Sequence, residues 1–331
     1  MIENYLNVRN STRNLSDEEF DEILPQLANE LRDICFYTKY SDDILYDSWE
    51  KLCKYNGEKI SPSTVIVGMK LCQHFFDNFY DIKNIKGDSF RLLWNNTENL
   101  KKILTWNRKS HSTPYLSELK RGIYFCCGLT KNTMFRPHLA KTICMEKVAV
   151  ENCVVLDPCA GWGGRMLGVS ATGNKYIGFE PCKETYDNLQ KLKSFLNLNN
   201  VTLYNDLAEN MKEYDFENVD IILTSPPYFN LEIYSDRGCE TKYSNYYEWM
   251  IKWLSPIIKM SLDRLKIDGW SCWNVHNMGK ISMIDHVRYI HEQLGYEKKD
   301  CFGIESGKRP TNNDSRKNLD ITNVFMRKGD K

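Results

Sequence analysis

The chain has 331 residues, of which 42% are hydrophobic and 27% charged, and its 44 basic residues balance its 44 acidic residues. This length and composition are typical of a soluble globular protein with one large domain and a smaller region. The net charge of zero argues against a protein that coats nucleic acid through phosphate contacts alone, so any nucleic-acid binding would depend on local basic patches.

The sequence gives no sign of a membrane segment or of a secretory signal. No apolar run is long enough to span a bilayer, and the N-terminus is polar. The 12 cysteines are scattered without a C-x-x-C pair, and the six histidines do not lie at zinc-ligand spacing beside them. We therefore expect a soluble intracellular protein with reduced, mostly buried thiols, no metal site and no membrane partner.

The first third of the chain is predicted to be helical. Ser16 and Glu19 form a capping box, and apolar residues then recur at helical spacing up to Leu31. The same spacing covers residues 45–55, and a third apolar segment covers residues 65–79. We expect residues 1–115 to be a helical layer with substrate recognition as an additional role, and residues 116–331 to be the catalytic domain.

From about residue 150 onward, short apolar runs alternate with amphipathic helical stretches. The runs predict strands at residues 153–156, 176–179, 201–204, 221–224 and 270–275, with an added edge strand at 323–326. Helices are predicted at residues 163–172, 183–198, 246–265 and 281–294. This alternation predicts an α/β, Rossmann-like, doubly wound and mostly parallel sheet. Because such sheets bind ligands beyond the carboxyl ends of their strands, the residues that follow each strand are the candidates for function.

The first predicted strand leads into a glycine-rich loop, Asp-Pro-Cys-Ala-Gly-Trp-Gly-Gly-Arg, at residues 157–165. Its glycines allow a sharp turn and a close approach to a ligand, but the loop is neither G-x-G-x-x-G nor a P-loop. An acidic residue at its start disfavours a phosphate and suits a cationic ligand, although a plain strand-to-helix turn is the alternative. The cofactor candidates in this loop are Asp157, Cys159, Ala160, Gly161, Trp162 and Gly163.

Acidic residues also follow the next two predicted strands. Glu180 is placed to accept hydrogen bonds from ribose hydroxyls, and Asp206, beside Asn205, to accept one from an adenine amino group. Each could instead cap the following helix. Three acidic residues at three successive strand ends predict a pocket for an adenosyl group with a positive centre, which is S-adenosyl-L-methionine.

The fourth predicted strand ends in Ser225-Pro226-Pro227-Tyr228. Two consecutive prolines fix the backbone and remove two N–H donors, leaving carbonyls beside a hydroxyl and an aromatic ring. This arrangement can accept hydrogen bonds from an NH₂ group while the ring stacks on a flat base. In isolation a proline-rich turn with a core tyrosine would be the simpler interpretation, but the position after the fourth strand favours a catalytic motif.

These segments resemble the S-adenosylmethionine-dependent amino-methyltransferases of nucleic acids, the N4-cytosine and N6-adenine DNA methyltransferase family with the class I methyltransferase fold. The loop and the Ser-Pro-Pro-Tyr motif carry the resemblance, which covers roughly residues 130–290. Phe135-Arg136-Pro137 resembles the family segment that packs on the methionine end of the cofactor, which adds Phe135 and Pro137 to the cofactor candidates. The wider pattern is similar to phage and viral DNA methyltransferases.

The resemblance implies that Ser225, Pro226, Pro227 and Tyr228 form the catalytic centre. Ser225 and the Pro226 carbonyl would accept the two amino hydrogens while Tyr228 stacks on a base turned out of the helix, and no metal is required. A serine at the first position favours N4 of cytosine slightly over N6 of adenine. Methylation at C5 of cytosine is disfavoured, because it would require a cysteine nucleophile after the fourth strand, where this sequence has Ser-Pro-Pro-Tyr.

Target recognition is expected from the N-terminal third or from residues 230–245. The substrate candidates are Phe229, Tyr234, Arg237, Lys242 and Tyr243, although an ordinary surface loop is an equal alternative. Basic pairs elsewhere are typical of solvated surface, and they lie at Lys101-Lys102, Arg108-Lys109, Lys120-Arg121 and Lys308-Arg309. DNA is the favoured partner. RNA or a protein glutamine remains an alternative substrate, and a catalytically silent nucleic-acid-binding subunit is an alternative that the intact motif opposes.

Overall fold

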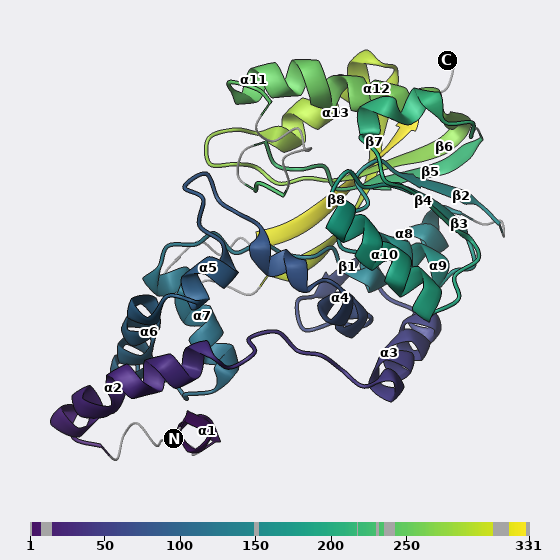
Figure 1. Cartoon of the computed structure of the whole chain (residues 1–331). Coiled ribbons are helices and arrows are strands. Elements are labelled where there is room, and N and C mark those ends of the chain that lie inside the picture. Colours follow the sequence, from purple (N-terminus) through teal and green to yellow (C-terminus); the bar gives the residue numbers. More distant parts are fainter. Residues whose placement is uncertain are drawn as a thin grey trace. The chain divides into compact units, whose positions relative to one another are not determined.

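The structure, a computed structural model, describes residues 2–7, 15–148, 152–216, 218–229, 232–234, 242–306 and 318–328. The chain divides into two compact units (Figure 1). The first consists of Met1–Lys39, Asp77–Thr133 and Asn230–Tyr234, and the second of Tyr40–Phe76, Met134–Phe229 and Ser235–Lys331. This division differs from the expected boundary at residue 115, because residues 40–76 belong to the unit that contains the sheet.

The first unit is helical, as expected in general terms for the first third of the chain. Its elements are α1 (Ile2–Asn7), α2 (Asp17–Arg32), η2 (Asp77–Asp81), α5 (Phe90–Trp94), α6 (Thr97–Lys109) and α7 (Leu116–Cys126). The capping box of α2 is confirmed, since Ser16 Oγ accepts from Glu19 N at 3.1 Å and the Glu19 carboxylate accepts from Ser16 N at 2.7 Å. Leu27, Trp94 and Leu104 are fully buried in the core of this unit.

The second unit is built on an eight-stranded sheet with the order β1-β7-β8-β6-β5-β2-β3-β4. Its strands are β1 (Ile60–Pro62), β2 (Val154–Asp157), β3 (Lys175–Phe179), β4 (Val201–Tyr204), β5 (Val219–Thr224), β6 (Leu265–Asn274), β7 (Tyr296–Ser306) and β8 (Asn318–Arg327). All neighbouring strands are parallel except β8, which is antiparallel to both β6 and β7. The predicted Rossmann-like, mostly parallel sheet is therefore confirmed.

One predicted position in the sheet is wrong. Residues 323–326 were expected to form an edge strand, but they lie in β8, which pairs with β6 on one side and β7 on the other. β8 is interior because β7 and the short β1 continue the sheet beyond it.

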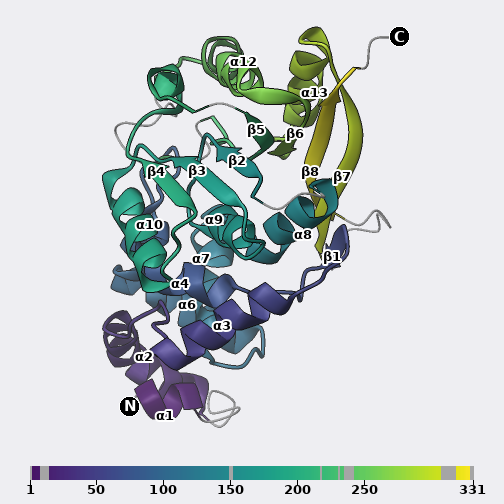
Figure 2. The ribbon, with the colours of Figure 1, turned by 90° about the vertical axis from the view of Figure 1, so that its right-hand side faces the viewer.

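Helices cover both faces of the sheet (Figure 2). One face carries α3 (Asp42–Lys54), α4 (Met69–Phe75), α8 (Pro137–Lys147), α9 (Gly164–Ser170) and α10 (Lys183–Phe195), and the other carries η3 (Ala208–Glu213), α11 (Tyr246–Trp249), the π-helical η4 (Met250–Leu254), α12 (Ser255–Asp263) and α13 (Met283–Gln293). Adjacent strand residues alternate between the two cores, Val155 toward α9 and Leu156 toward α12. This alternation explains the nearly continuous apolar strands.

The described cysteines are free thiols, four of them buried, five half-buried and two exposed. No helix in the described ranges is long and apolar enough to cross a membrane. The same ranges contain no group of three or more His, Cys, Asp or Glu side chains that could hold a metal ion.

Candidate active site

The glycine-rich loop between β2 and α9 is organised by Asp157, which is fully buried at the end of β2. One carboxylate oxygen accepts from Thr224 Oγ1 at 2.7 Å and from Cys159 N at 3.2 Å. The other accepts from Arg165 Nε and from the Tyr176 hydroxyl, both at 2.7 Å. The carboxylate that we expected to suit a cationic ligand is thus paired with Arg165 of the same chain, and it joins the loop to the end of β5.

Arg165 holds the loop from the first turn of α9. Its side chain is only 5% exposed, and its Nη2 donates to the carbonyls of Cys159 and Ala160. Burial opposes its charge, but Asp157 and Tyr176 outweigh burial and raise the pKa of Arg165. Its guanidinium lies 5.2 Å from the ring centroid of Phe135. The loop backbone is therefore fixed by a buried cation.

The glycines of the loop meet two different needs. Gly161 and Gly163 have φ of +56° and +75°, a region that side chains disfavour. Gly164 instead permits a close approach, since a Cβ there would lie 1.9 Å from the carbonyl oxygen of Phe135. Pro137 is buried in the first turn of α8, and α8 and α9 pack closely there, since a Cβ at Gly168 would lie 2.3 Å from the Pro137 carbonyl oxygen.

The two acidic residues after β3 and β4 lie at the same sheet edge as Asp157. Glu180 is 8% exposed, and its carboxylate accepts from Gly161 N at 3.0 Å and Cys182 N at 2.9 Å. Asp206 accepts from Asn210 Nδ2 and the Tyr214 hydroxyl, both at 2.9 Å. Neither residue is the N-cap of the helix that follows it, so the capping alternative does not explain them.

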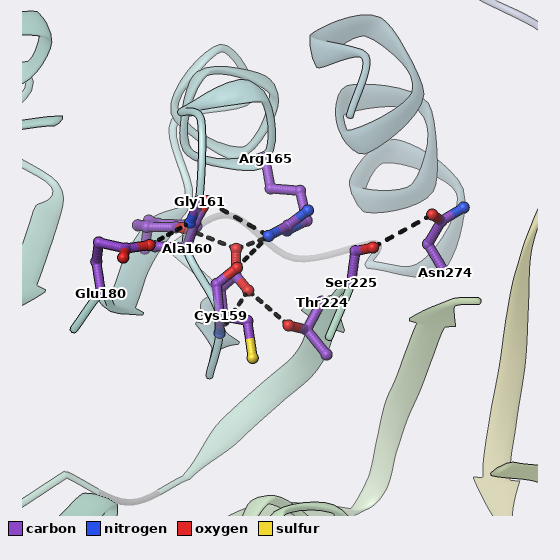
Figure 3. Close-up of polar contacts among 10 residues, drawn as sticks. Cys159, Ala160, Gly161, Arg165, Glu180, Thr224, Ser225 and Asn274 are labelled. Atoms are coloured by element: carbon purple, nitrogen blue, oxygen red, sulfur yellow. Dashed lines mark hydrogen bonds and ion pairs between the residues drawn. The ribbon is translucent and has the colours of Figure 1, made fainter. Parts of the chain in front are cut away.

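The predicted catalytic motif follows β5. Pro226 is buried, whereas Ser225, Pro227 and Tyr228 are half-buried. Ser225 Oγ donates to Asn274 Oδ1 at 3.4 Å (Figure 3), and the Tyr228 hydroxyl lies 2.8 Å from His276 Nδ1. Thr224, whose hydroxyl donates to Asp157, directly precedes the motif in the chain.

Sequence reasoning missed three polar residues beside this motif. Asn274 ends β6, and its Nδ2 donates to Asp320 Oδ1 at 2.7 Å. His276 follows β6, and its Nε2 lies 3.1 Å from the same oxygen. His276 was accessible to the rule that polar residues after strands matter, because it directly follows the predicted strand 270–275, whereas Asn274 lies within that predicted strand. Asp320 was not, since the direction of β8 was unknown.

The predicted substrate residues that the structure describes have different surroundings. Phe229 is 9% exposed and packs with Tyr246 and Trp249 in the apolar core. Tyr234 belongs to the first unit and donates to Glu232. Lys242 lies 3.9 Å from Glu209, and Tyr243 packs against the second unit's core. Arg237 lies outside the described residues.

Several predicted basic surface groups are paired with acids in the first unit. Lys101 lies 2.8 Å from Glu98, and Arg108 lies 2.9 Å from Asp17. Arg121 lies 2.7 Å from the carboxylate of Glu118. Lys308 and Arg309 lie outside the described residues. These pairs reduce the local positive charge that a phosphate contact would need.

Comparison with known proteins gives a partial sequence match. The chain is 36% identical over 85 residues to the type II methyltransferase M.MjaVI of Methanocaldococcus jannaschii, and the match covers 25% of this chain and 41% of that protein. The chain thus spans less than half the length of the curated relative that it matches. No protein-family model matches the chain.

Solved structures show limited likeness at low sequence identity. TrmN from Thermus thermophilus aligns with a TM-score of 0.42 at 15% identity, covering 58% of this chain and 48% of TrmN. An rRNA methylase from Streptococcus thermophilus aligns with 0.41 at 15%, covering 59% and 99%. A protein from Streptococcus mutans, in complex with SAH, aligns with 0.40 at 16%, covering 58% and 99%.

The strand order itself defines the fold class. From β4 to β7, the order β4-β3-β2-β5-β6-β8-β7 with a single antiparallel strand, β8, is that of the class I methyltransferase fold. β1 is an additional strand beside β7.

The residues at the carboxyl ends of β2, β3 and β4 fit S-adenosylmethionine. Glu180 and Asp206 offer carboxylate acceptors for the hydroxyls and the amino group of an adenosyl moiety. A Cβ at Gly161 would make only ordinary van der Waals contacts, the nearest with the carbonyl oxygen of Cys159 at 3.7 Å. Half-buried Trp162, which packs edge-on against Phe76 at 6.1 Å, provides an apolar wall.

Proposed function

We propose that this chain is an S-adenosylmethionine-dependent methyltransferase that acts on an exocyclic amino nitrogen of a DNA base. One observation carries the proposal: the Ser-Pro-Pro-Tyr motif follows β5 and is joined through Thr224 and Asp157 to the glycine-rich loop after β2. The cofactor site and the motif are thus two neighbouring parts of one hydrogen-bonded sheet edge.

The loop and the acidic residues after β3 and β4 would hold the cofactor. Glu180 would bind the ribose hydroxyls, Asp206 would receive the adenine amino group, and Phe135 with Pro137 would border the methionine end. When bound, S-adenosylmethionine supplies an electrophilic methyl group on a positively charged sulfur. Arg165 has no direct role in this binding, because its guanidinium faces Asp157 and the loop carbonyls.

The motif residues would prepare the amino nitrogen for attack. An aromatic amine is a weak nucleophile because its lone pair is delocalised into the ring. The Ser225 hydroxyl donates its hydrogen to Asn274, so the lone pairs of the Ser225 oxygen can accept a hydrogen bond from the amine. The Pro226 carbonyl would accept the second amino hydrogen, and Tyr228 would stack on the base. Catalysis here is positioning and electrostatics, with in-line attack on the methyl carbon.

DNA and the N4 atom of cytosine are the favoured target within this proposal. The partial match to a type II methyltransferase supports DNA, and the serine that opens the motif favours cytosine over adenine. RNA and a protein glutamine share the same chemistry of an amino acceptor. Parallel assays with the three substrate classes separate them, with DNA expected to be methylated most rapidly.

Variants of the motif test catalysis against mere binding. We expect Ser225→Ala to lower the rate of transfer on the order of 10²–10³-fold, as loss of a preorganised polar group does. We expect Tyr228→Ala to weaken the reaction about 10- to 100-fold through lost stacking. Tyr289→Ala on the exposed face of α13 is the matched control and should leave the rate unchanged. Cofactor binding by calorimetry should persist in all three variants.

The outcomes separate an enzyme from a catalytically silent subunit. Cofactor binding and a rate that falls in both motif variants support the proposal. A chain that binds DNA but transfers no methyl group would be a silent subunit. Equal rates for the wild type and both motif variants would place the chemistry elsewhere.

A further inference from the structure

The side chains of Ser225 and Tyr228 are each linked, through one intervening residue, to a single carboxylate on β8. Asp320, near the start of β8, accepts with Oδ1 from Asn274 Nδ2 at 2.7 Å and lies 3.1 Å from His276 Nε2. Asn274 Oδ1 in turn accepts a hydrogen bond from the Ser225 hydroxyl, and His276 Nδ1 lies within hydrogen-bond distance of the Tyr228 hydroxyl. Two hydrogen-bonded paths therefore diverge from a single oxygen to the two reactive side chains of the motif.

The first path fixes the direction of the Ser225 hydroxyl. An ionised carboxylate only accepts hydrogen bonds, so the Asn274 atom that faces Asp320 must be the amide nitrogen. This orientation points the amide oxygen of Asn274 at Ser225, so the hydroxyl has to donate. Asn274 is 5% exposed and also contacts Thr322 Oγ1 at 3.3 Å, which holds the amide in place.

The second path fixes the tautomer of His276. Asp320 favours a proton on Nε2, which leaves Nδ1 of a neutral imidazole as an acceptor for the Tyr228 hydroxyl. Burial alone would raise the pKa of Asp320, but hydrogen bonds from His276 and Asn274 and the charge of Arg136 lower it overall. Asp320 is therefore ionised at neutral pH, as both paths require.

We propose that Asp320 is a positioning residue for the methyl transfer: through Asn274 it makes Ser225 an acceptor for the target amine, and through His276 it fixes the ring of Tyr228. This inference rests on the function proposed above. It assigns a purpose to Asn274 and His276 and to the antiparallel strand that brings Asp320 to the carboxyl edge of the parallel strands.

The test is a double-mutant cycle with kinetic and binding readouts. Asp320→Ala should lower kcat on the order of 10²-fold, as loss of preorganisation at a reacting group does, with cofactor affinity unchanged. Asp320→Asn keeps an oxygen that can accept from both partners, so it should recover most of this loss. Asp263→Ala, an exposed acid on α12, is the matched control and should be neutral.

The cycle separates positioning from a general structural role. In a Ser225→Ala/Tyr228→Phe background, Asp320→Ala should cost at least about tenfold less than in the wild type, because the side chains it positions are already altered. Equal fold-losses in the two backgrounds, or a loss of cofactor affinity in Asp320→Ala, would overturn the proposal. If Asp320→Ala does not fold, His276→Phe replaces it, and the cycle is completed with Tyr228→Phe.

A readout independent of methylation keeps this inference distinct from the proposed function. Long-range ¹⁵N–¹H spectra report the tautomer of His276, which should be protonated at Nε2 in the wild type. A His276 protonated only at Nδ1 would overturn the positioning role even in an active enzyme. A wild type with the Nε2 tautomer and no methyl transfer to any substrate would instead refute the proposed function, and the positioning role with it.

Discussion

The buried pair of Asp157 and Arg165 yields the most specific prediction of stability. In Arg165→Met the apolar part of the side chain is largely kept, but the charge and its donors are lost. Asp157 would still accept hydrogen bonds from the hydroxyls of Tyr176 and Thr224 and from a backbone N–H. Its negative charge, however, would be left without a cation at a site that is fully buried. The carbonyls of Cys159 and Ala160 would lose a donor as well.

The magnitude follows from the burial of both groups. Their side chains are 5% and 0% exposed, and removing one partner of such a pair costs about 3–5 kcal/mol. We expect this decrease in the free energy of unfolding, measured by urea titration, and at least a tenfold weaker affinity for S-adenosylmethionine by calorimetry, because the loop backbone would no longer be held.

Arg288→Met is the matched control. Arg288 pairs with Asp285 on α13, where the two side chains are 47% and 54% exposed, so its loss should cost about 0–1 kcal/mol. If Arg165→Met lowers the unfolding free energy no more than Arg288→Met, the assignment of Asp157 and Arg165 as the buried anchor of the loop is refuted.

Two further predictions concern stability. Burial lowers the pKa of His291 from its usual 6.5 to about 4, so the neutral ring stabilises the fold above pH 6.5 and this contribution is lost as the pH falls toward 4. His291→Gln should remove about 3 kcal/mol of that pH dependence, and an unchanged slope of unfolding free energy against pH would contradict this. Gly164→Ala would place a Cβ 1.9 Å from the Phe135 carbonyl and should cost about 1–3 kcal/mol or more. Gly173→Ala meets no atom within 4 Å and has φ +79°, so only about 1–2 kcal/mol of backbone strain is expected; a larger thermal shift for Gly173→Ala would contradict the packing argument.

The core of the fold was predictable because its strands are buried on both faces. Apolar runs such as residues 153–156 and 221–224 stand out between amphipathic helices, and all five predicted parallel strands are found with ends shifted by a few residues. β7 was missed because it opens with charged residues at 297–300, and β1 because it has only three residues, one of them a proline. Without β7, residues 323–326 could only be assigned to an edge.

The site was predictable where it follows the order of the chain. Each parallel strand delivers its next residues to one edge, which made Asp157, Glu180 and Ser225 visible from the sequence. The partners of these residues were not visible, because pairing is a property of the folded state. Arg165 neutralises Asp157 within the protein, and Asp320 comes from β8, an antiparallel strand whose residues reach that edge at its beginning instead of its end.

The most direct test of the central claim is transfer of a tritiated methyl group from S-adenosylmethionine to DNA, RNA and protein in parallel, followed by mass spectrometry of the nucleosides. We predict label in DNA, recovered as N4-methylcytosine and lost in Ser225→Ala. Label only in RNA or protein would contradict the proposed substrate. Neither cofactor binding nor label in any substrate would contradict the account as a whole.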